Sequence, residues 1–226
     1  MSNCFILKRA TEKTLENMAI MEESIRMSQE YQNECTRVKN IPNGWLTVTD
    51  NVQKKVAKHF GFQDDVNNEI ACNDLRRAHI TYPDNAIFKQ SVYVRNNKAN
   101  MGTLNENDLV PNIDVHTIDN RIIKLSDIFQ DKKINIFFGA SNTKQPFRAY
   151  LHLLEDFYKN QNDKYNMFII YITEAHAADV WNIGESAGTI NYSHKSISDR
   201  IACVNKLKNE YNLIIPIYAD NMNNDF

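Results

Sequence analysis

The hydrophobic pattern of this 226-residue chain changes near residue 96. Before that point, apolar side chains recur every three or four positions, which is typical of amphipathic helices. Three helices are predicted, in "TEKTLENMAIMEESIRMSQEYQNECTRV", in "TVTDNVQKKVAKHFGF" and in "NNEIACNDLRRAHITYP". We expect Thr49 or Asp50 to cap the second helix and Gly61 to end it. Residues 1–95 are therefore predicted to form a mainly helical extension.

From residue 96 onward, short apolar runs alternate with helical segments. "PNIDVHTIDNRIIKLSDIF" predicts a hairpin with its turn near Asp119 and Asn120. "KINIFFGA", "YNMFIIYIT" and "LIIPIYAD" are continuous apolar runs, which indicates strands buried on both faces. Helices are predicted between them, in "PFRAYLHLLEDFYKNQ" and "SISDRIACVNKLKNEYN". This order predicts an α/β domain over residues 96–226, with a parallel or mixed sheet and right-handed crossovers.

One strand-to-helix turn lies where α/β enzymes place a nucleophile or bind an anion. In "NIFFGASNTKQPFRAYL", the apolar run ends at Gly139 and the next helix starts near Pro146. Free N–H groups and the helix dipole at such a turn lower the pKa of a thiol. This turn holds Thr143 and Lys144 but no cysteine. An ammonium group is not nucleophilic, so the turn favours anion binding over covalent chemistry.

Composition and charge narrow the classes of protein that this chain can belong to. The formal charge of −2 gives no electrostatic case for nucleic acid binding. No segment approaches the roughly 20 apolar residues that cross a bilayer, and the N-terminus lacks a secretory apolar region. We therefore expect a soluble, cytoplasmic protein with no membrane partner. The widely spaced Cys4, Cys35, Cys72 and Cys203 suit buried positions in a reducing compartment, or a thiol pair formed by folding. No metal site is predicted.

Five motifs between Tyr93 and Phe226 resemble the iodothyronine deiodinase family. They are "YVRNNKANMGTLNENDLVP", "FFGASNTKQPF", "IIYITEAHAADVW", "SHKSISDR" and "YADNMNNDF", in the order of the family. The resemblance implies a thioredoxin-like, peroxiredoxin-related domain. Residues 45–88 resemble the helical extension of non-animal members, which stands where animal members carry a membrane anchor. Because the family continues with a strand pair and a terminal helix, the resemblance also implies a C-terminally truncated sheet.

The family's activity, as the resemblance implies it, is thiol-dependent reductive deiodination at a selenocysteine or cysteine. That position aligns with Lys144 here, so we expect weak or no deiodinase activity and consider the chain a candidate pseudoenzyme. The only cosubstrate implied is a thiol reductant, with no other cofactor, and the family's dimers imply a homodimer. Asp199 and Arg200 are interpreted as a structural ion pair or helix cap. The resemblance also implies catalytic roles for Glu174, His176 and His194, and substrate contacts for Thr143, Tyr171 and Trp181.

Three interpretations stay open at this point. The first is a non-catalytic protein that binds a small aromatic or halogenated molecule, or an anion beside Lys144. The second is an active oxidoreductase that takes its thiol from Cys203 or Cys72. The third is an interaction protein in which the N-terminal helices bind a partner and the thioredoxin-like domain is a scaffold.

Overall fold

The computed structural model describes residues 7–96 and 104–226. Contacts divide the chain into a helical unit, Met1–Gly102 with Trp181–Ser186, and a sheet unit, Thr103–Val180 with Ala187–Phe226. The sequence pattern had grouped residues 181–186 with the sheet, whereas their contacts assign them to the helices. Cys4 and the middle of the "YVRNNKANMGTLNENDLVP" motif lie outside the described residues.

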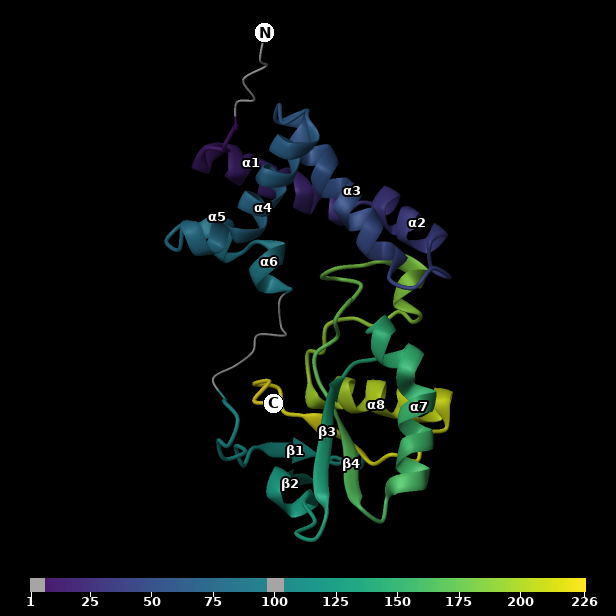
Figure 1. Ribbon diagram of the computed structural model, residues 1–226. Coiled ribbons are helices and arrows are strands. Elements are labelled where there is room, and N and C mark those ends of the chain that lie inside the picture. Colours follow the sequence, from purple (N-terminus) through teal and green to yellow (C-terminus); the bar gives the residue numbers. More distant parts are fainter. Residues whose placement is uncertain (1–6, 97–103) are drawn as a thin grey trace. The chain divides into compact units, whose positions relative to one another are not determined.

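The helical unit consists of helices that lie against one another (Figure 1). Its described helices are α1 (Glu12–Arg26), α2 (Gln29–Arg37), α3 (Gly44–His59), α4 (Asp65–Thr81), α5 (Ala86–Lys89) and α6 (Val92–Arg95). The periodic positions of the sequence form its core, because Met18, Val56 and Leu75 are all buried.

Two helix boundaries differ from the prediction for local reasons. The first predicted helix is interrupted because Ser28 accepts a hydrogen bond from the N–H of Tyr31 (3.2 Å) and caps a new helix. The predicted cap at Thr49 or Asp50 is wrong, since α3 already begins at Gly44. The predicted end is confirmed, because α3 stops at His59 and Gly61 adopts a φ of +88°.

The sheet unit contains five described strands in the order β2-β1-β5-β4-β3 (Figure 1). They are β1 (Asp114–His116), β2 (Ile122–Lys124), β3 (Ile134–Ala140), β4 (Tyr165–Tyr171) and β5 (Ile217–Asp220). β3, β4 and β5 run parallel, whereas β1 is antiparallel to both of its neighbours. The predicted hairpin is confirmed as β1 and β2, and Asn120 in its turn has a φ of +63°.

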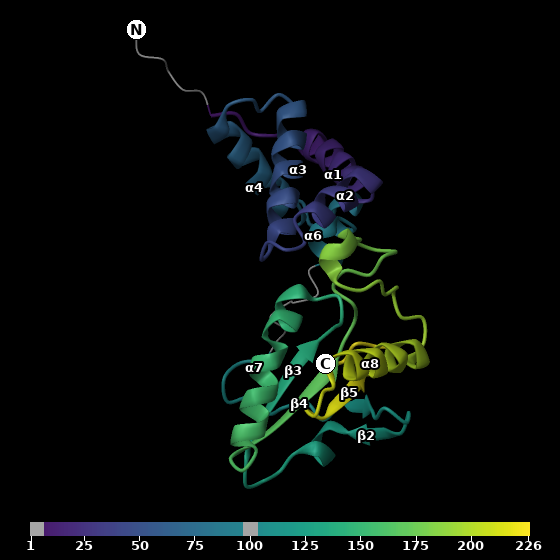
Figure 2. The same cartoon turned by 90° about the vertical axis from the view of Figure 1, so that its right-hand side faces the viewer.

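Helices α7 (Gln145–Gln161) and α8 (Ile197–Tyr211) cover one face of this sheet (Figure 2). Both crossovers step in the same direction along the sheet, and crossovers of one hand then place both helices on one face. Phe137, Phe168 and Ile170 face the other side, where they pack against the segment around the short η1 helix (Leu125–Ile128). The predicted class is therefore confirmed as a mixed α/β sheet flanked by helices, consistent with a thioredoxin-like fold.

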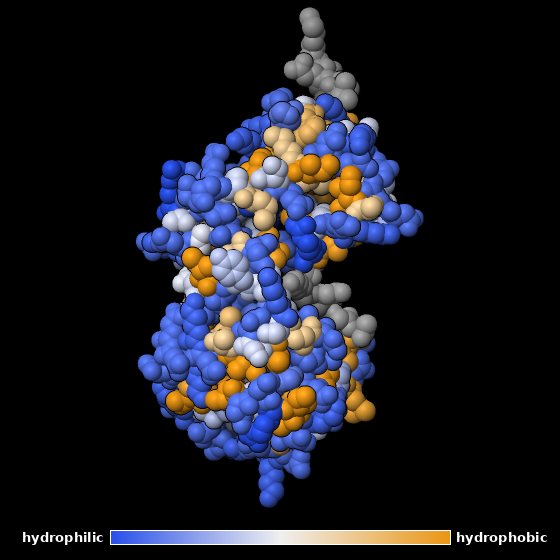
Figure 3. Space-filling view, turned by 180° about the vertical axis from the view of Figure 1, so that it is seen from behind, coloured by the Kyte–Doolittle hydropathy of each residue, from blue (hydrophilic) through white to orange (hydrophobic). Residues whose placement is uncertain are grey.

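β3 lies at one edge of this sheet, and among the described residues its only strand partner is β4. Its first residue, Ile134, is 63% exposed. The surface seen in Figure 3 is mainly hydrophilic, with scattered apolar patches. Within the described part of the chain, no helix is both long enough and apolar enough to cross a membrane.

Candidate functional site

The candidate site forms where β3 leads into α7. β3 ends at Ala140, which lies opposite Tyr171, the last residue of the parallel strand β4. The carboxyl ends of both strands therefore meet at one edge of the sheet, where α/β proteins bind ligands. Ser141 Oγ accepts a hydrogen bond from the N–H of Ala175 (3.2 Å), which ties the segment after β4 to the turn after β3. This tie brings Glu174 beneath the turn.

Neutral donors surround the buried carboxylate of Glu174, which is 2% exposed. Thr143 donates twice to Oε2, from its backbone N–H (3.0 Å) and from its hydroxyl (2.6 Å). Asn191 donates to Oε1 at 2.8 Å, and the hydroxyl of Tyr171 donates to the same oxygen. A buried charge is tolerated when its lone pairs are satisfied in this way.

These bonds decide the ionisation of Glu174. Burial alone would raise its pKa, but the nearby imidazole of His194 and the hydrogen bonds from Thr143 and Tyr171 outweigh burial and lower the pKa to about 2. Burial and the neighbouring negative charge of Glu174 raise the pKa of Tyr171, which stays a protonated donor. Glu174 is thus a permanent carboxylate at neutral pH and a weak proton acceptor.

The side chain of His194 lies beside this carboxylate and is 2% exposed. Its Nε2 is 3.6 Å from Oε1 of Glu174, and its Nδ1 accepts a hydrogen bond from Nε of Arg200 at 3.2 Å. The backbone N–H of the second predicted histidine, His176, donates to the hydroxyl of Thr143 at 3.0 Å. The two histidine segments therefore meet the turn through Thr143 and Glu174.

Lys144 occupies the N-cap position of α7 on the outer side of the turn. Its side chain is exposed, and its backbone N–H is used inside the turn on the carbonyl of Ser141 (3.2 Å). Pro146, the second residue of α7, has no N–H group to offer a ligand. Lys144 is therefore accessible and presents an ammonium group at the start of α7.

The hydroxyl of Thr143 is a poor nucleophile in this setting. Its hydroxyl has a carboxylate neighbour, but a carboxylate with a pKa of about 2 is a weak base. The side chain is also fully buried, as is that of Tyr171. Both residues act here as supports of Glu174, and their predicted contact with a substrate stays a prediction.

Trp181 belongs to the helical unit. Its Nε1 donates to the hydroxyl of Tyr31 at 3.2 Å, and its ring lies edge-on to Trp45 with centroids 5.5 Å apart. The guanidinium of Arg26 lies 4.9 Å above the ring. The structure therefore gives Trp181 a packing role among the helices, and its predicted contact with a substrate stays a prediction.

Asn191 and Arg200 reach the site without having been predicted there, and Cys203, one of the two cysteines considered as a thiol source, also lies at the site. Arg200 and Cys203 are three positions apart on α8 and so share a helix face, a signal that the sequence did contain. Burial and the charge of Glu174 raise the pKa of Cys203 to about 11, and burial raises the pKa of Cys72. Both thiols are protonated at neutral pH, which argues against the interpretation that either supplies the nucleophile.

Glu174, His194 and Cys203 place donor atoms within 4.8 Å of one another, a grouping that a metal ion could use. The surrounding bonds oppose it. A histidine that binds a metal donates the hydrogen of its other nitrogen, whereas Nδ1 of His194 accepts one from Arg200. The oxygens of Glu174 are already bonded to Thr143, Tyr171 and Asn191. This donor set does not fit a metal centre.

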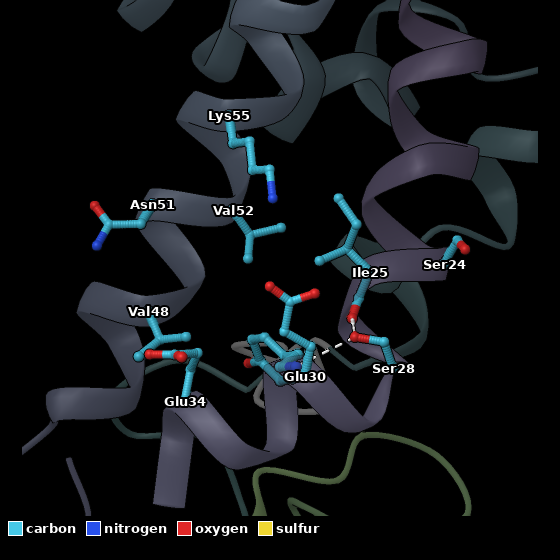
Figure 4. Close-up of a pocket in the computed structure, with 10 residues that line it drawn as sticks. Ser24, Ile25, Ser28, Glu30, Glu34, Val48, Asn51, Val52 and Lys55 are labelled. Atoms are coloured by element: carbon cyan, nitrogen blue, oxygen red, sulfur yellow. Dashed lines mark hydrogen bonds between the residues drawn. The ribbon is translucent and has the colours of Figure 1, made fainter. Parts of the chain in front are cut away.

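The helical unit has a separate pocket of about 330 Å³ between α1, α2 and α3. In Figure 4, Ile25 and Val52 line it with apolar side chains, and Glu30 and Lys55 point into it from opposite sides. None of the predicted site residues lines it. Because its walls carry both signs of charge, the pocket does not favour an anion.

The mixed sheet flanked by helices, with a buried, hydrogen-bonded glutamate where β3 and β4 end, is consistent with an α/β protein of thioredoxin-like type. The family model described as iodothyronine deiodinase matches residues 42–226, so the chain belongs to that family. The matched region includes α3 to α6 as well as the whole sheet unit. A type I iodothyronine deiodinase of Xenopus laevis is 29% identical over 114 residues. That match covers 50% of this chain and 44% of the relative.

Proposed function

We propose that this protein keeps the proton-handling half of a deiodinase site and lacks the nucleophilic half. The observation that carries the proposal is the contrast at one turn. Beneath the turn, Glu174 is held by Thr143, Tyr171 and Asn191 beside His194. Above it, the aligned nucleophile position is the exposed ammonium group of Lys144. Thiol-dependent dehalogenation is therefore weak or absent.

Family membership supports a small aromatic or halogenated molecule as the ligand. Reductive removal of iodine replaces carbon–iodine with carbon–hydrogen, releases iodide and oxidises two thiols to a disulfide. The reaction needs a soft anionic nucleophile for the iodine and a group that manages the proton. The described site offers only the second, through His176, His194 and the Glu174 network.

Anion binding is the weaker alternative at this turn. Three of its N–H groups are occupied, because those of Asn142, Thr143 and Lys144 donate to Tyr171, Glu174 and Ser141 respectively. The carboxylate of Glu174 also repels an anion that approaches the same turn. We therefore propose an aromatic ligand rather than an inorganic anion. A cytoplasmic location and a homodimer stay predictions.

Restoring a thiol tests this proposal. Lys144→Cys places a cysteine at the start of α7, where the helix dipole lowers its pKa. We expect the wild type to release iodide from an iodinated phenol at the blank rate with dithiothreitol present. Lys144→Cys should exceed that rate at least ~10-fold, the scale of a barrier change of about 1.4 kcal/mol.

Lys144→Ser is the matched control, because it removes the ammonium group without adding a thiol. It should stay at the wild-type rate. A wild type that already turns over, keeps its rate in Lys144→Ser and loses it in Cys203→Ala would overturn the proposal in favour of a thiol from α8.

A further inference from the structure

Arg200 is a buried cation at the back of the candidate site, only 1% exposed. It lies in the first turns of α8, after the cap that Ser196 and Asp199 form. Its nearest carboxylate oxygen, Oδ2 of Asp220, is 3.8 Å away. The guanidinium donates to the carbonyls of Asp220 (3.0 Å) and Asn221 (2.6 Å), to Asn224 Oδ1 (2.8 Å), to Thr173 Oγ1 (3.4 Å) and to His194 Nδ1 (3.2 Å).

The bond to His194 determines where the imidazole carries its hydrogen. An arginine has only donors and stays protonated in proteins, so Nε of Arg200 must donate. Nδ1 of His194 must then accept with its lone pair, which leaves the ring hydrogen on Nε2. Nε2 is the nitrogen that faces Oε1 of Glu174, at 3.6 Å. A cationic donor on one side and a carboxylate on the other therefore favour the same tautomer.

We propose that Arg200 is a positioning residue that fixes His194 as its Nε2–H tautomer. The hydrogen that a ligand or a relay would use is thereby held on the side of Glu174. Its use in a reaction rests on the proposed function, whereas the tautomer itself does not. The interpretation of Asp199 and Arg200 is divided accordingly, with Asp199 as a helix cap and Arg200 as part of the site.

Different nitrogens of the Arg200 guanidinium serve the positioning role and the structural role. Its two terminal nitrogens hold Asp220, Asn221 and Asn224 at the end of β5 and beyond. Its Nε contacts His194. Asn224→Ala therefore removes a structural contact of Arg200 and leaves the bond to the imidazole in place. This variant is the matched control.

Nitrogen-15 NMR of histidine-labelled protein reads the tautomer directly, because Nδ1 and Nε2 give different couplings to the ring hydrogens. The chain has six histidines, and His194→Gln assigns the signal. We expect the Nε2–H pattern in the wild type and in Asn224→Ala. Arg200→Met should lose that pattern and show Nδ1–H or a mixture of both forms.

An Nδ1–H pattern in the wild type would overturn the proposal, and so would an unchanged Nε2–H pattern in folded Arg200→Met. If Arg200→Met does not fold, the wild-type spectrum and that of Arg200→Lys decide instead. Lysine cannot donate from an Nε position, so Arg200→Lys should also lose the Nε2–H pattern, and an unchanged pattern in that variant would contradict the proposal. Iodide release by Lys144→Cys is measured separately. An inactive Lys144→Cys with the expected tautomer sinks the proposed function and leaves the role of Arg200 intact.

Discussion

Glu22 in the helical unit and Glu174 in the sheet unit are both almost fully buried, and the two carboxylates are held in different ways. Glu22 on α1 has no exposed surface. Its carboxylate accepts hydrogen bonds from Arg26 (2.6 and 2.9 Å), from Gln53 (3.1 Å) and from the hydroxyl of Tyr93. Its charge is thus cancelled by a guanidinium one helical turn away, and the pair forms a closed structural unit.

Glu174 is also deeply buried and also accepts from a tyrosine, but no cation of the described residues is bonded to it. Its partners are the hydroxyl and backbone of Thr143, the amide of Asn191 and the hydroxyl of Tyr171. These donors stabilise the charge without cancelling it, so its negative potential reaches His194. The comparison distinguishes a buried charge that holds a fold together from one that is kept available for a site.

The largest expected effect comes from opening the ion pair of the helical unit. Arg26→Met leaves the carboxylate of Glu22 buried without its cation, and such a loss costs about 3–5 kcal/mol. Both tryptophans of the chain, Trp45 and Trp181, belong to this unit. Urea unfolding followed by tryptophan fluorescence therefore measures the effect where it occurs.

The double variant Arg26→Met/Glu22→Gln shows whether the loss reflects the uncompensated charge. Glutamine keeps an acceptor for Gln53 and Tyr93 but carries no charge. We expect it to recover most of the stability that Arg26→Met loses. A double variant as unstable as Arg26→Met would mean that packing over Trp181, not charge, dominates at this position.

Acid should reveal the second glutamate. The folded pKa of Glu174 is about 2 against an ordinary value near 4.5, which corresponds to about 3 kcal/mol of stability. Because the folded pKa is the lower one, this stability is present above pH 4.5 and is lost as the pH falls toward 2. Hydrogen exchange of the β4 amides between pH 6 and pH 2.5 follows the loss in the sheet unit.

Glu174→Gln should be less stable than the wild type at pH 6. On acidification, the variant should lose less stability than the wild type loses. Glu106→Gln, at an exposed position of the same unit, controls for the removal of one charge. If Glu174→Gln and the wild type respond equally to acid, the bonds around Glu174 do not favour its charged form, and the contrast with Glu22 disappears.

The fold was predictable because the spacing of apolar residues along the sequence distinguishes strands from helices. The alternation of "KINIFFGA" and "YNMFIIYIT" with amphipathic helices specifies β3, β4 and α7 whatever the details of each turn. Helix boundaries were less predictable, because a single side-chain bond decided them. The cap at Ser28 divides α1 from α2, and no periodic signal marks it.

The candidate site was predictable only where motifs marked it. Glu174 and His194 came from the resemblance, and the structure brings them together. Asn191 lies in an irregular segment with no pattern of its own, so only tertiary contacts reveal its bond to Glu174. Glu22 was missed for a related reason. A glutamate on an amphipathic helix reads as exposed until Gln53 and Tyr93, far along the chain, are placed beside it.

The smallest expected effect comes from two helix caps, one in each unit. Ser28 and Ser196 are both half-buried N-caps, and each accepts a backbone N–H at 3.2 Å. Alanine at either position should cost about 1 kcal/mol, and glycine only a few tenths, because a cap acts locally. Tryptophan fluorescence measures Ser28→Ala, and exchange of the α8 amides measures Ser196→Ala. Equal losses would show that the two caps contribute alike, whereas unequal losses would reflect their surroundings, the bond from Ser28 to the Ile25 carbonyl and the capping box of Ser196 with Asp199.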